Sequence, residues 1–346
     1  MKAVRINKPG EAELFSANKP APKPGEALLK ILYGGICGSD LGTYRGTFAY
    51  ASYPRIPGHE FSAQIVEIDP ADAEKYHLHA GQIVTCNPYF NCGTCYSCER
   101  GFVNCCEHNE TMGAQRDGAF MEYITMPVER IYDGKGLSPL ELALIEPFCI
   151  SYHGASHAHI QPGEKVLVVG AGTIGVLAAA AAKAAGAKVY IADIAPKKLD
   201  HAVEIMSLTG KILNDTPEHF AAQVQEITHG NGFDVTIEAV GLPATFLACV
   251  DAAAFGGRVV QVGVGKRNAD FNFTLLQKKE LKLYGSRNAL KKDFLELIDL
   301  VKSGKIDITK IVTNVYELKD APHAFKDFSE HADTMLKVVI HFADPE

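Results

Sequence analysis

The 346-residue chain lacks the features of membrane-spanning, secreted and nucleic-acid-binding proteins. Its longest strongly apolar stretch, Val166 to Ala182, has 17 residues and is interrupted by glycines, which is marginal for a membrane span. The first residues, MKAVRINKPGEAEL, contain no apolar segment of the kind found in signal peptides. There is no long Lys or Arg run, and the formal net charge is −7, so nucleic acid and anionic membranes are not expected partners. We therefore expect a cytoplasmic protein.

The sequence also lacks the even cysteine count of a disulfide-linked scaffold, because it has nine cysteines. In a reducing compartment such residues are metal ligands, catalytic groups or ordinary buried thiols. Six of the nine lie within the 21 residues from Cys86 to Cys106. Clustering of this kind favours metal binding over a set of inert thiols.

Four of the clustered cysteines have the spacing of a closed zinc site. They follow the pattern C-x2-C-x2-C-x7-C and are Cys92, Cys95, Cys98 and Cys106. Four thiolates on a short loop can surround one tetrahedral zinc and leave no open position, so we predict a structural zinc. Cys105 is an alternative fourth ligand, and spacing favours Cys106. Cys86, Cys105, Cys149 and Cys249 are expected to be ordinary thiols.

The length and the change of texture along the chain predict two domains. Residues 1 to about 145 are rich in Gly, Pro and Cys and contain short alternating runs such as Ala27 to Leu32, which are typical of a loop-rich β domain. From Lys165 onwards, apolar runs of strand length alternate with helical segments such as Lys197 to Met206. This rhythm predicts an α/β domain with a doubly wound parallel sheet.

A dinucleotide fingerprint lies at the start of the second domain. Gly170, Gly172 and Gly175 form G-x-G-x-x-G between an apolar strand and an Ala-rich helix, and Asp193 follows Gly170 by 23 residues at the end of the next strand. Asp193 can accept hydrogen bonds from the adenosine ribose and repels a 2′-phosphate, so NAD is expected rather than NADP. Lys197 and Lys198 follow Asp193 closely in the sequence, and their positive charges suit a 2′-phosphate, so NADP stays an alternative cofactor. Further cofactor contacts are expected from Thr173, Ile174, Val262 and Arg287.

Cys37 and His59 form weaker evidence for a second metal site by spacing alone. They lie, however, in a series of motifs that runs along the whole chain in order: GICGSD, GHE, the four cysteines, DGAFMEY, LIEPF and VGAGTIG. In the identity and the order of these motifs, the chain resembles the zinc-dependent medium-chain dehydrogenases. The resemblance implies a GroES-like catalytic domain formed by residues 1–150 and 287–346, and a Rossmann NAD-binding domain formed by residues 151–286.

The resemblance also implies a catalytic zinc held by Cys37 and His59, with Glu60 and Glu146 sharing the remaining positions with water or substrate. One thiolate, one imidazole and one carboxylate leave an open site at which a substrate hydroxyl can lose its proton. Cys149 is an alternative to Glu146. Two zinc ions per chain are therefore expected.

Two further residues of the first motif receive roles from the resemblance. Ser39 takes the hydroxyl proton, and Asp40 orients His59. Many relatives have a histidine five residues after the zinc cysteine, whereas this chain has Gly42. The proton relay must then end in water, in the cofactor ribose or in another group, for which the candidates are Thr43, Tyr44, His153 and His157.

The substrate is expected to be a sugar acid or polyol whose secondary hydroxyl is oxidised. The polar residues considered for its pocket are Tyr44, Arg45, Arg55, Arg116 and Arg287, of which we select Tyr44 and Arg287. The segments NCCE, IEPF and GSRN are most similar to bacterial dehydrogenases of the L-galactonate type. Alternatives are L-threonine 3-dehydrogenase, polyol-phosphate or simple alcohol dehydrogenase activity and, from another class, a non-enzymatic NAD- and zinc-binding redox sensor. Relatives imply a homodimer or homotetramer.

Overall fold

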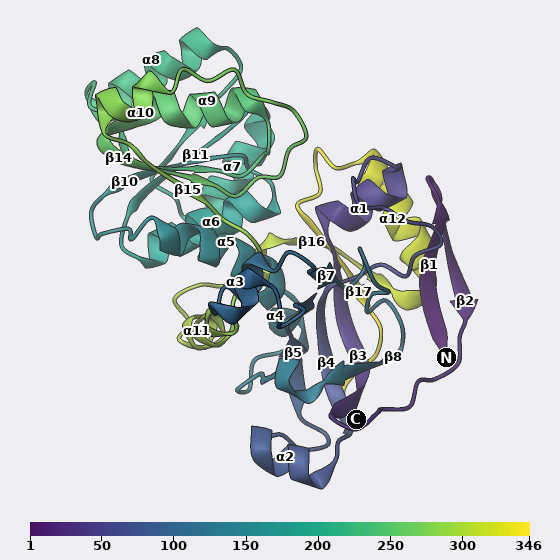
Figure 1. Cartoon of the computed structure of the whole chain (residues 1–346). Helices are drawn as coiled ribbons and strands as arrows, with labels where there is room; N and C mark the ends of the chain where they lie inside the picture. Colours follow the sequence, from purple (N-terminus) through teal and green to yellow (C-terminus); the bar gives the residue numbers. More distant parts are fainter. The chain divides into compact units, whose positions relative to one another are not determined.

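The computed structural model describes residues 1–346, which form two units (Figure 1). Unit 1 comprises Met1–Glu146 together with Leu290–Glu346, and unit 2 comprises Pro147–Ala289. The domain boundaries expected from the sequence, after residues 150 and 286, lie four and three residues from these divisions. Unit 1 is thus discontinuous in sequence, whereas unit 2 is a single continuous segment.

A seven-stranded sheet forms the centre of unit 1, in the order β16-β17-β3-β4-β5-β9 with β8 paired to β3. Its strands are β3 (Glu26–Ile36), β4 (Glu60–Glu67), β5 (Ile83–Cys86), β8 (Tyr123–Pro127), β9 (Ile131–Asp133), β16 (Val312–Glu317) and β17 (Lys337–His341). The strand pairs are antiparallel except for β16 with β17. Because β17 is inserted between β16 and β3, the end of the chain is an integral part of the sheet.

The other elements of unit 1 surround this sheet. They are β1 (Lys2–Lys8), β2 (Glu11–Ser16), α1 (Gly38–Arg45), α2 (Pro70–Tyr76), β6 (Tyr89–Phe90), α3 (Tyr96–Glu99), η1 (Val103–Cys105), β7 (Glu110–Thr111), η2 (Val128–Arg130), α4 (Pro139–Ala143), α11 (Lys291–Lys302), η3 (Ile308–Ile311), η4 (Leu318–Asp320) and α12 (Ala321–Glu330). Apolar residues of α1, α12 and β17 share one buried cluster that includes Phe120 and Phe325. This packing joins the N-terminal and C-terminal parts of the unit.

Unit 2 contains a parallel six-stranded sheet in the order β12-β11-β10-β13-β14-β15. Its elements are α5 (Ile145–His157, which begins in unit 1), β10 (Lys165–Val169), α6 (Thr173–Ala184), β11 (Lys188–Asp193), α7 (Pro196–Met206), β12 (Gly210–Leu213), α8 (Pro217–Thr228), β13 (Phe233–Glu238), α9 (Pro243–Ala252), β14 (Ala253–Gln261), α10 (Thr274–Lys279) and β15 (Lys282–Gly285). Helices α6 and α7 cover one face of the sheet, and α8 and α9 cover the other (Figure 1). The strand order reverses between β10 and β13, which is where doubly wound sheets bind ligands.

The secondary structure follows the sequence patterns closely. The predicted strand Ala27 to Leu32 lies within β3, and the predicted helix Lys197 to Met206 corresponds to α7. Helix α6 is almost wholly buried, because its run of small alanine side chains lets it lie close to the sheet. None of the helices has both the length and the apolar character that a bilayer crossing requires. The predicted α/β fold class is confirmed.

Candidate functional site

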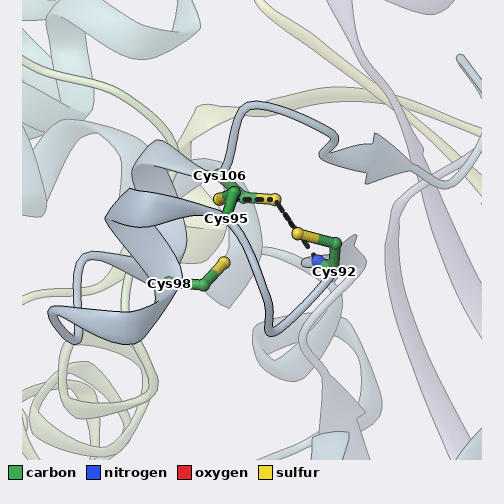
Figure 2. Close-up of side chains that lie close together, drawn as sticks. All are labelled: Cys92, Cys95, Cys98 and Cys106. Carbon is green, nitrogen blue, oxygen red and sulfur yellow. Dashed lines mark hydrogen bonds between the residues drawn. The ribbon is translucent and has the colours of Figure 1, made fainter.

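The four cysteines Cys92, Cys95, Cys98 and Cys106 lie close together in unit 1 (Figure 2). Their sulfur atoms are all within 4.8 Å of one another. The Sγ of Cys106 is 3.6 Å from that of Cys92 and 3.9 Å from that of Cys95. A tetrahedral ZnS₄ site with Zn–S bonds of about 2.3 Å requires sulfur separations of about 3.8 Å. The group therefore has the dimensions of a closed zinc site.

The surroundings of these thiols favour metal binding. Backbone hydrogen bonding near Thr94 lowers the pKa of Cys92 to about 6, and the backbone amide of Cys92 donates to Cys106 Sγ at 3.3 Å. Burial raises the pKa of Cys98 to about 11, so this thiol needs a cation nearby to ionise at neutral pH. Cys105, the alternative fourth ligand, is exposed and outside the group, whereas Cys106 is buried within it.

A second set of metal-ligating atoms is formed by Cys37, His59 and Glu60, whose ligand atoms also lie within 4.8 Å of one another. Cys37 immediately precedes α1, His59 immediately precedes β4, and Glu60 is the first residue of β4. Strand β4 pairs with β3, which brings Glu60 opposite Gly35 and close to Cys37. A thiolate, an imidazole and a carboxylate form a donor set that suits an open zinc site.

Asp40 holds the two segments that carry Cys37 and His59. Its carboxylate accepts hydrogen bonds from the backbone amides of Cys37 (3.0 Å) and Gly58 (3.1 Å). Its Oδ1 is 3.9 Å from His59 Nδ1, a distance that allows charge attraction but no hydrogen bond. Orientation of His59 by a direct bond from Asp40 therefore stays a prediction. What the structure contains is a carboxylate that fixes two backbone segments.

Burial and charge shift the ionisation of this group strongly. Burial acts to lower the pKa of His59, but Cys37, Asp40 and Glu146 together raise it well above its ordinary value. Burial also raises the pKa of Asp40 and raises that of Glu146 to about 7. A dication held by Cys37, His59 and Glu60 would act in the opposite direction and lower the pKa of both acids.

Glu146 and Glu60 have different partners. Glu146, the second residue of α5, accepts a hydrogen bond from the hydroxyl of Tyr89 and is not in the group formed with Cys37. Glu60 forms a buried ion pair with Lys337, whose ammonium also donates to the carbonyl of Ile36 at 3.3 Å. Burial acts to lower the pKa of Lys337, but the charge of Glu60 raises it overall. The ligand role of either carboxylate stays a prediction.

The residues predicted for proton transfer and substrate binding have mixed surroundings. The backbone carbonyl of Ser39 accepts a hydrogen bond from the hydroxyl of Thr43 at 3.0 Å, so the two residues lie one turn apart on α1. Tyr44 is buried, and its ring centroid lies 5.8 Å from that of Phe325. This packing fixes the ring, and the role of Tyr44 in substrate binding stays a prediction. At Gly42, where many relatives have a histidine, an added Cβ atom would lie 3.2 Å from the Cβ atom of Phe48, so a larger side chain would crowd Phe48.

The remaining candidates for the relay and the pocket have other partners. Arg55 and Arg116 lie near the acidic residues Asp117 and Glu110, and Arg45 donates to Ser329. His153 and His157 are both on α5, with their Nε2 atoms 3.3 Å apart. They form a pair within unit 2, and neither belongs to the group of Cys37.

The G-x-G-x-x-G segment forms the turn between β10 and α6. Gly170 has a φ of 112°, which favours glycine, and a Cβ on Gly175 would lie 1.8 Å from the carbonyl oxygen of Gly170. Asp193 ends β11, and its carboxylate accepts from the amides of Ala171 (2.8 Å) and Ala195 (3.0 Å). The acidic residue is thus fixed beside the glycine turn, as a Rossmann dinucleotide site requires.

The other predicted cofactor residues lie near the carboxyl ends of strands or beyond them. Thr173 and Ile174 begin α6, and Val262, which is buried, directly follows β14. Arg287 follows β15 and is exposed. Thr173, Ile174 and Val262 belong to the same rim of the sheet as Asp193.

Sequence reasoning missed three residues at these sites: Tyr89, Lys337 and Glu238. Tyr89 donates to Glu146, and Lys337 pairs with Glu60. Glu238 is the last residue of β13 and is fully buried. The sequence feature that could have indicated two of them is a charged residue at one end of an apolar run. Lys337 begins the run KVVIHF, and Glu238 lies near the end of the run DVTIEAV.

Comparison with known proteins gives a consistent result. The model "Alcohol dehydrogenase GroES-like domain" matches residues 23–135, and the model "Zinc-binding dehydrogenase" matches residues 173–303. The chain is 37% identical to L-galactonate-5-dehydrogenase of Escherichia coli (strain K12) over 99% of each protein. This chain belongs to the zinc-dependent medium-chain dehydrogenase family. The resemblance drawn from the motifs is confirmed.

Other relatives of this dehydrogenase illustrate the range of the family. It is 34% identical to L-threonine 3-dehydrogenase of Pyrococcus horikoshii over 92% of each chain. A solved structure described as a short chain alcohol dehydrogenase from E. coli CFT073, complexed with NADH, is 28% identical with a TM-score of 0.89 and covers 99% of each chain. The relatives therefore place the chain in the zinc-type dehydrogenase class.

Proposed function

We propose that this dehydrogenase oxidises a secondary hydroxyl of a sugar acid or polyol, reversibly and with NAD as the acceptor. The observation that carries the proposal is the group of Cys37, His59 and Glu60, whose three different ligand types lie within 4.8 Å. The similarity to L-galactonate-5-dehydrogenase supports a sugar acid as the substrate. Exposed Arg287 supplies a guanidinium that can bind a carboxylate through two hydrogen bonds.

The roles of the residues follow from their chemistry. Bound zinc supplies Lewis acidity that lowers the pKa of a ligated hydroxyl, and bound NAD supplies the hydride acceptor. Cys37, His59 and a carboxylate from Glu60 or Glu146 hold the metal, while Asp40 keeps the segments before α1 and β4 in place. Ser39, on the first turn of α1, accepts a hydrogen bond from the substrate hydroxyl and, as it takes that proton, passes its own proton on to water or to the cofactor ribose. Cys92, Cys95, Cys98 and Cys106 hold a second, structural zinc.

The cofactor site is proposed at the carboxyl ends of β10 and β11. Gly170, Gly172 and Gly175 admit the pyrophosphate close to the backbone, and Asp193 binds the adenosine ribose. NAD is favoured over NADP because the Asp193 carboxylate would repel a 2′-phosphate. The residue after it is the exposed Ile194, which offers no positive charge.

A substrate panel together with one variant tests this proposal. NADH formation should be fastest with sugar acids or polyols, compared with polyol phosphates, L-threonine and unsubstituted alcohols. Cys37→Ser should lower kcat roughly a thousandfold, because the thiolate that helps hold the catalytic metal is lost. The variant should retain NADH binding and the zinc of the four-cysteine group.

Cys105→Ser is the matched control, since it removes an exposed thiol outside both groups. It should leave kcat and zinc content unchanged. Full activity of Cys37→Ser would refute the assigned catalytic group. A preference for an unsubstituted alcohol or for threonine would refute the assigned substrate class.

We also propose that the protein is cytoplasmic and forms a homodimer or homotetramer. The metal-ligating cysteine groups support a reducing compartment, where thiols bind metals instead of forming disulfides, and cell fractionation can check this. Strand β15 supports oligomerisation, because it is an edge strand of the unit 2 sheet. An exposed edge offers unpaired backbone groups to a second copy.

A further inference from the structure

Glu238 joins the two turns that follow β13 and β14. Its Oε1 accepts from the amides of Val240 and Gly241, both at 2.9 Å, and from the Thr245 hydroxyl at 2.6 Å. Its Oε2 accepts from Gly241 at 3.1 Å and from the side-chain amide of Gln261 at 2.5 Å. Neutral N–H and O–H donors thus solvate this fully buried carboxylate. Such an arrangement is costly to break, because a buried polar group would lose its partner.

Gln261 extends this connection into the turn after β14. The same amide nitrogen that donates to Glu238 also donates to the carbonyl of Gly263 at 2.8 Å. The backbone carbonyl of Glu238 accepts from Val262 (2.9 Å) and Gly263 (3.0 Å). A Cβ on Gly263 would lie 2.2 Å from the Gly241 nitrogen and 2.4 Å from Glu238 Oε2. The two turns therefore interlock around one carboxylate.

These turns lie beside the dinucleotide fingerprint. Val169, the last residue of β10, is opposite Glu238 in the parallel ladder, and its carbonyl accepts from the amide of Ala239. A Cβ on Gly170 would lie 2.7 Å from Val240 Cγ2. The turn fixed by Glu238 thus packs directly against the first glycine of the fingerprint, at the reversal of strand order between β10 and β13.

The strand order separates the two halves of a bound dinucleotide. Asp193 ends β11, on one side of β10, whereas Glu238 and Gln261 end β13 and β14, on the other side. Because Rossmann sheets bind one mononucleotide over each half, the half opposite Asp193 lies over β13 and β14. Both turns there expose an apolar side chain, with Val240 41% and Val264 88% exposed. Such side chains offer a surface to a flat heterocycle.

We propose that Glu238 is a positioning residue for the nicotinamide half of the dinucleotide, which it serves by locking the turns after β13 and β14 together. The inference rests on the proposed NAD-dependent function and adds a determinant of cofactor affinity outside the glycine fingerprint. Its effect is local, because the carboxylate acts through backbone groups of residues 240, 241 and 263.

Glu238→Gln in the full-length, zinc-loaded protein tests the proposal. The amide keeps the shape of the side chain but sets its NH₂ group against the NH₂ of Gln261. If the Gln261 amide turns over to offer its unpartnered Oε1 instead, it loses its hydrogen bond to the Gly263 carbonyl, so the link from residue 238 to the second turn is broken in either orientation. Calorimetric titration should show NADH binding weakened about tenfold, the effect of one unsatisfied buried group. Binding of AMP, which carries neither the pyrophosphate link nor the nicotinamide half, should weaken much less than binding of NADH. A purely structural defect would weaken both ligands alike.

A second variant and a control complete the design. Gln261→Met breaks the same connection from the opposite side and should reproduce the selective loss of NADH affinity. If Glu238→Gln folds poorly, Gln261→Met alone still tests the proposal. Thr236→Val removes a buried hydrogen bond of β13, to the carbonyl of Cys249 at 3.0 Å, without touching either turn. It should lower the unfolding midpoint and leave both affinities unchanged.

The outcomes separate this inference from the proposed function. If the wild-type protein bound no NADH, both would be overturned. If the wild type bound NADH and the two connection variants bound it equally well, or lost NADH and AMP affinity in equal measure, only the role of Glu238 would be overturned. Selective loss of NADH affinity in both variants supports it.

Discussion

Lys337 and Glu60 form a buried ion pair whose members are 277 residues apart in sequence. Both side chains are almost completely buried, and Cys37, which contributes a further negative charge, is close enough to raise the pKa of Lys337. A buried charge without its partner is strongly destabilising. The pair therefore holds the side chain of Glu60, a metal ligand candidate, in place.

Lys337→Met should lower the free energy of unfolding of the metal-free protein by about 3–5 kcal/mol, because Glu60 would stay buried without a counter-charge. Lys337→Arg, which keeps the positive charge, should lower it by less. Urea denaturation after chelation of zinc measures both changes. Zinc should reduce the loss in Lys337→Met, since a dication supplies part of the missing charge. Equal stability of Lys337→Met and the wild type would contradict this account of the pair.

The site residues that could be predicted from the sequence are those with short-range patterns. The spacing of the cysteines and of G-x-G-x-x-G is local, so these residues could be grouped before the fold was known. Lys337 and Glu238 could not, because their partners are brought to them by strand pairing and by turns elsewhere in the chain. Tyr44 is selected for its polar hydroxyl, and its ring packs against Phe325, so its role in substrate binding stays a prediction.

At the scale of elements, the segment from Cys92 to Cys106 has little regular structure of its own. It contains only the four-residue helix α3 and the three-residue helix η1. Its apolar residue Phe102 is exposed rather than packed in a core. Metal ligation is the physical means by which such a short segment acquires a fixed conformation. The stability of the segment should therefore depend on zinc.

Cys106→Ser should remove one of the two zinc ions per chain and make the segment sensitive to proteolysis near Arg100, whereas Cys105→Ser should retain both ions. The difference arises because Cys106 Sγ is 3.6 Å and 3.9 Å from the sulfurs of Cys92 and Cys95, while Cys105 is exposed outside the group. Metal analysis by mass spectrometry and limited trypsin digestion measure the two effects. Loss of zinc from Cys105→Ser with retention in Cys106→Ser would reverse the assignment.

At the scale of the whole molecule, hydrophobic periodicity was sufficient to predict a β-rich part and a doubly wound part. It could not predict that β17 lies between β16 and β3, because strand order depends on long-range pairing. The return of the chain to the first domain came instead from the motifs shared with a known family. The discontinuity matters physically, since Val338, Val339 and Ile340 of β17 are fully buried in unit 1.

The six-stranded and seven-stranded sheets each have an edge strand with an exposed apolar residue: Leu283 on β15 is 44% exposed, and Val315 on β16 is 50% exposed. If copies of the chain associate through β15, Leu283→Lys should place like charges opposite one another across the two-fold axis and favour the monomer of 37.4 kDa. Val315→Lys changes a matched residue on the other sheet and should leave the oligomer intact. Light scattering coupled to gel filtration measures both masses. A monomeric wild type would refute the oligomer itself, whereas an intact Leu283→Lys oligomer would exclude β15 as its interface.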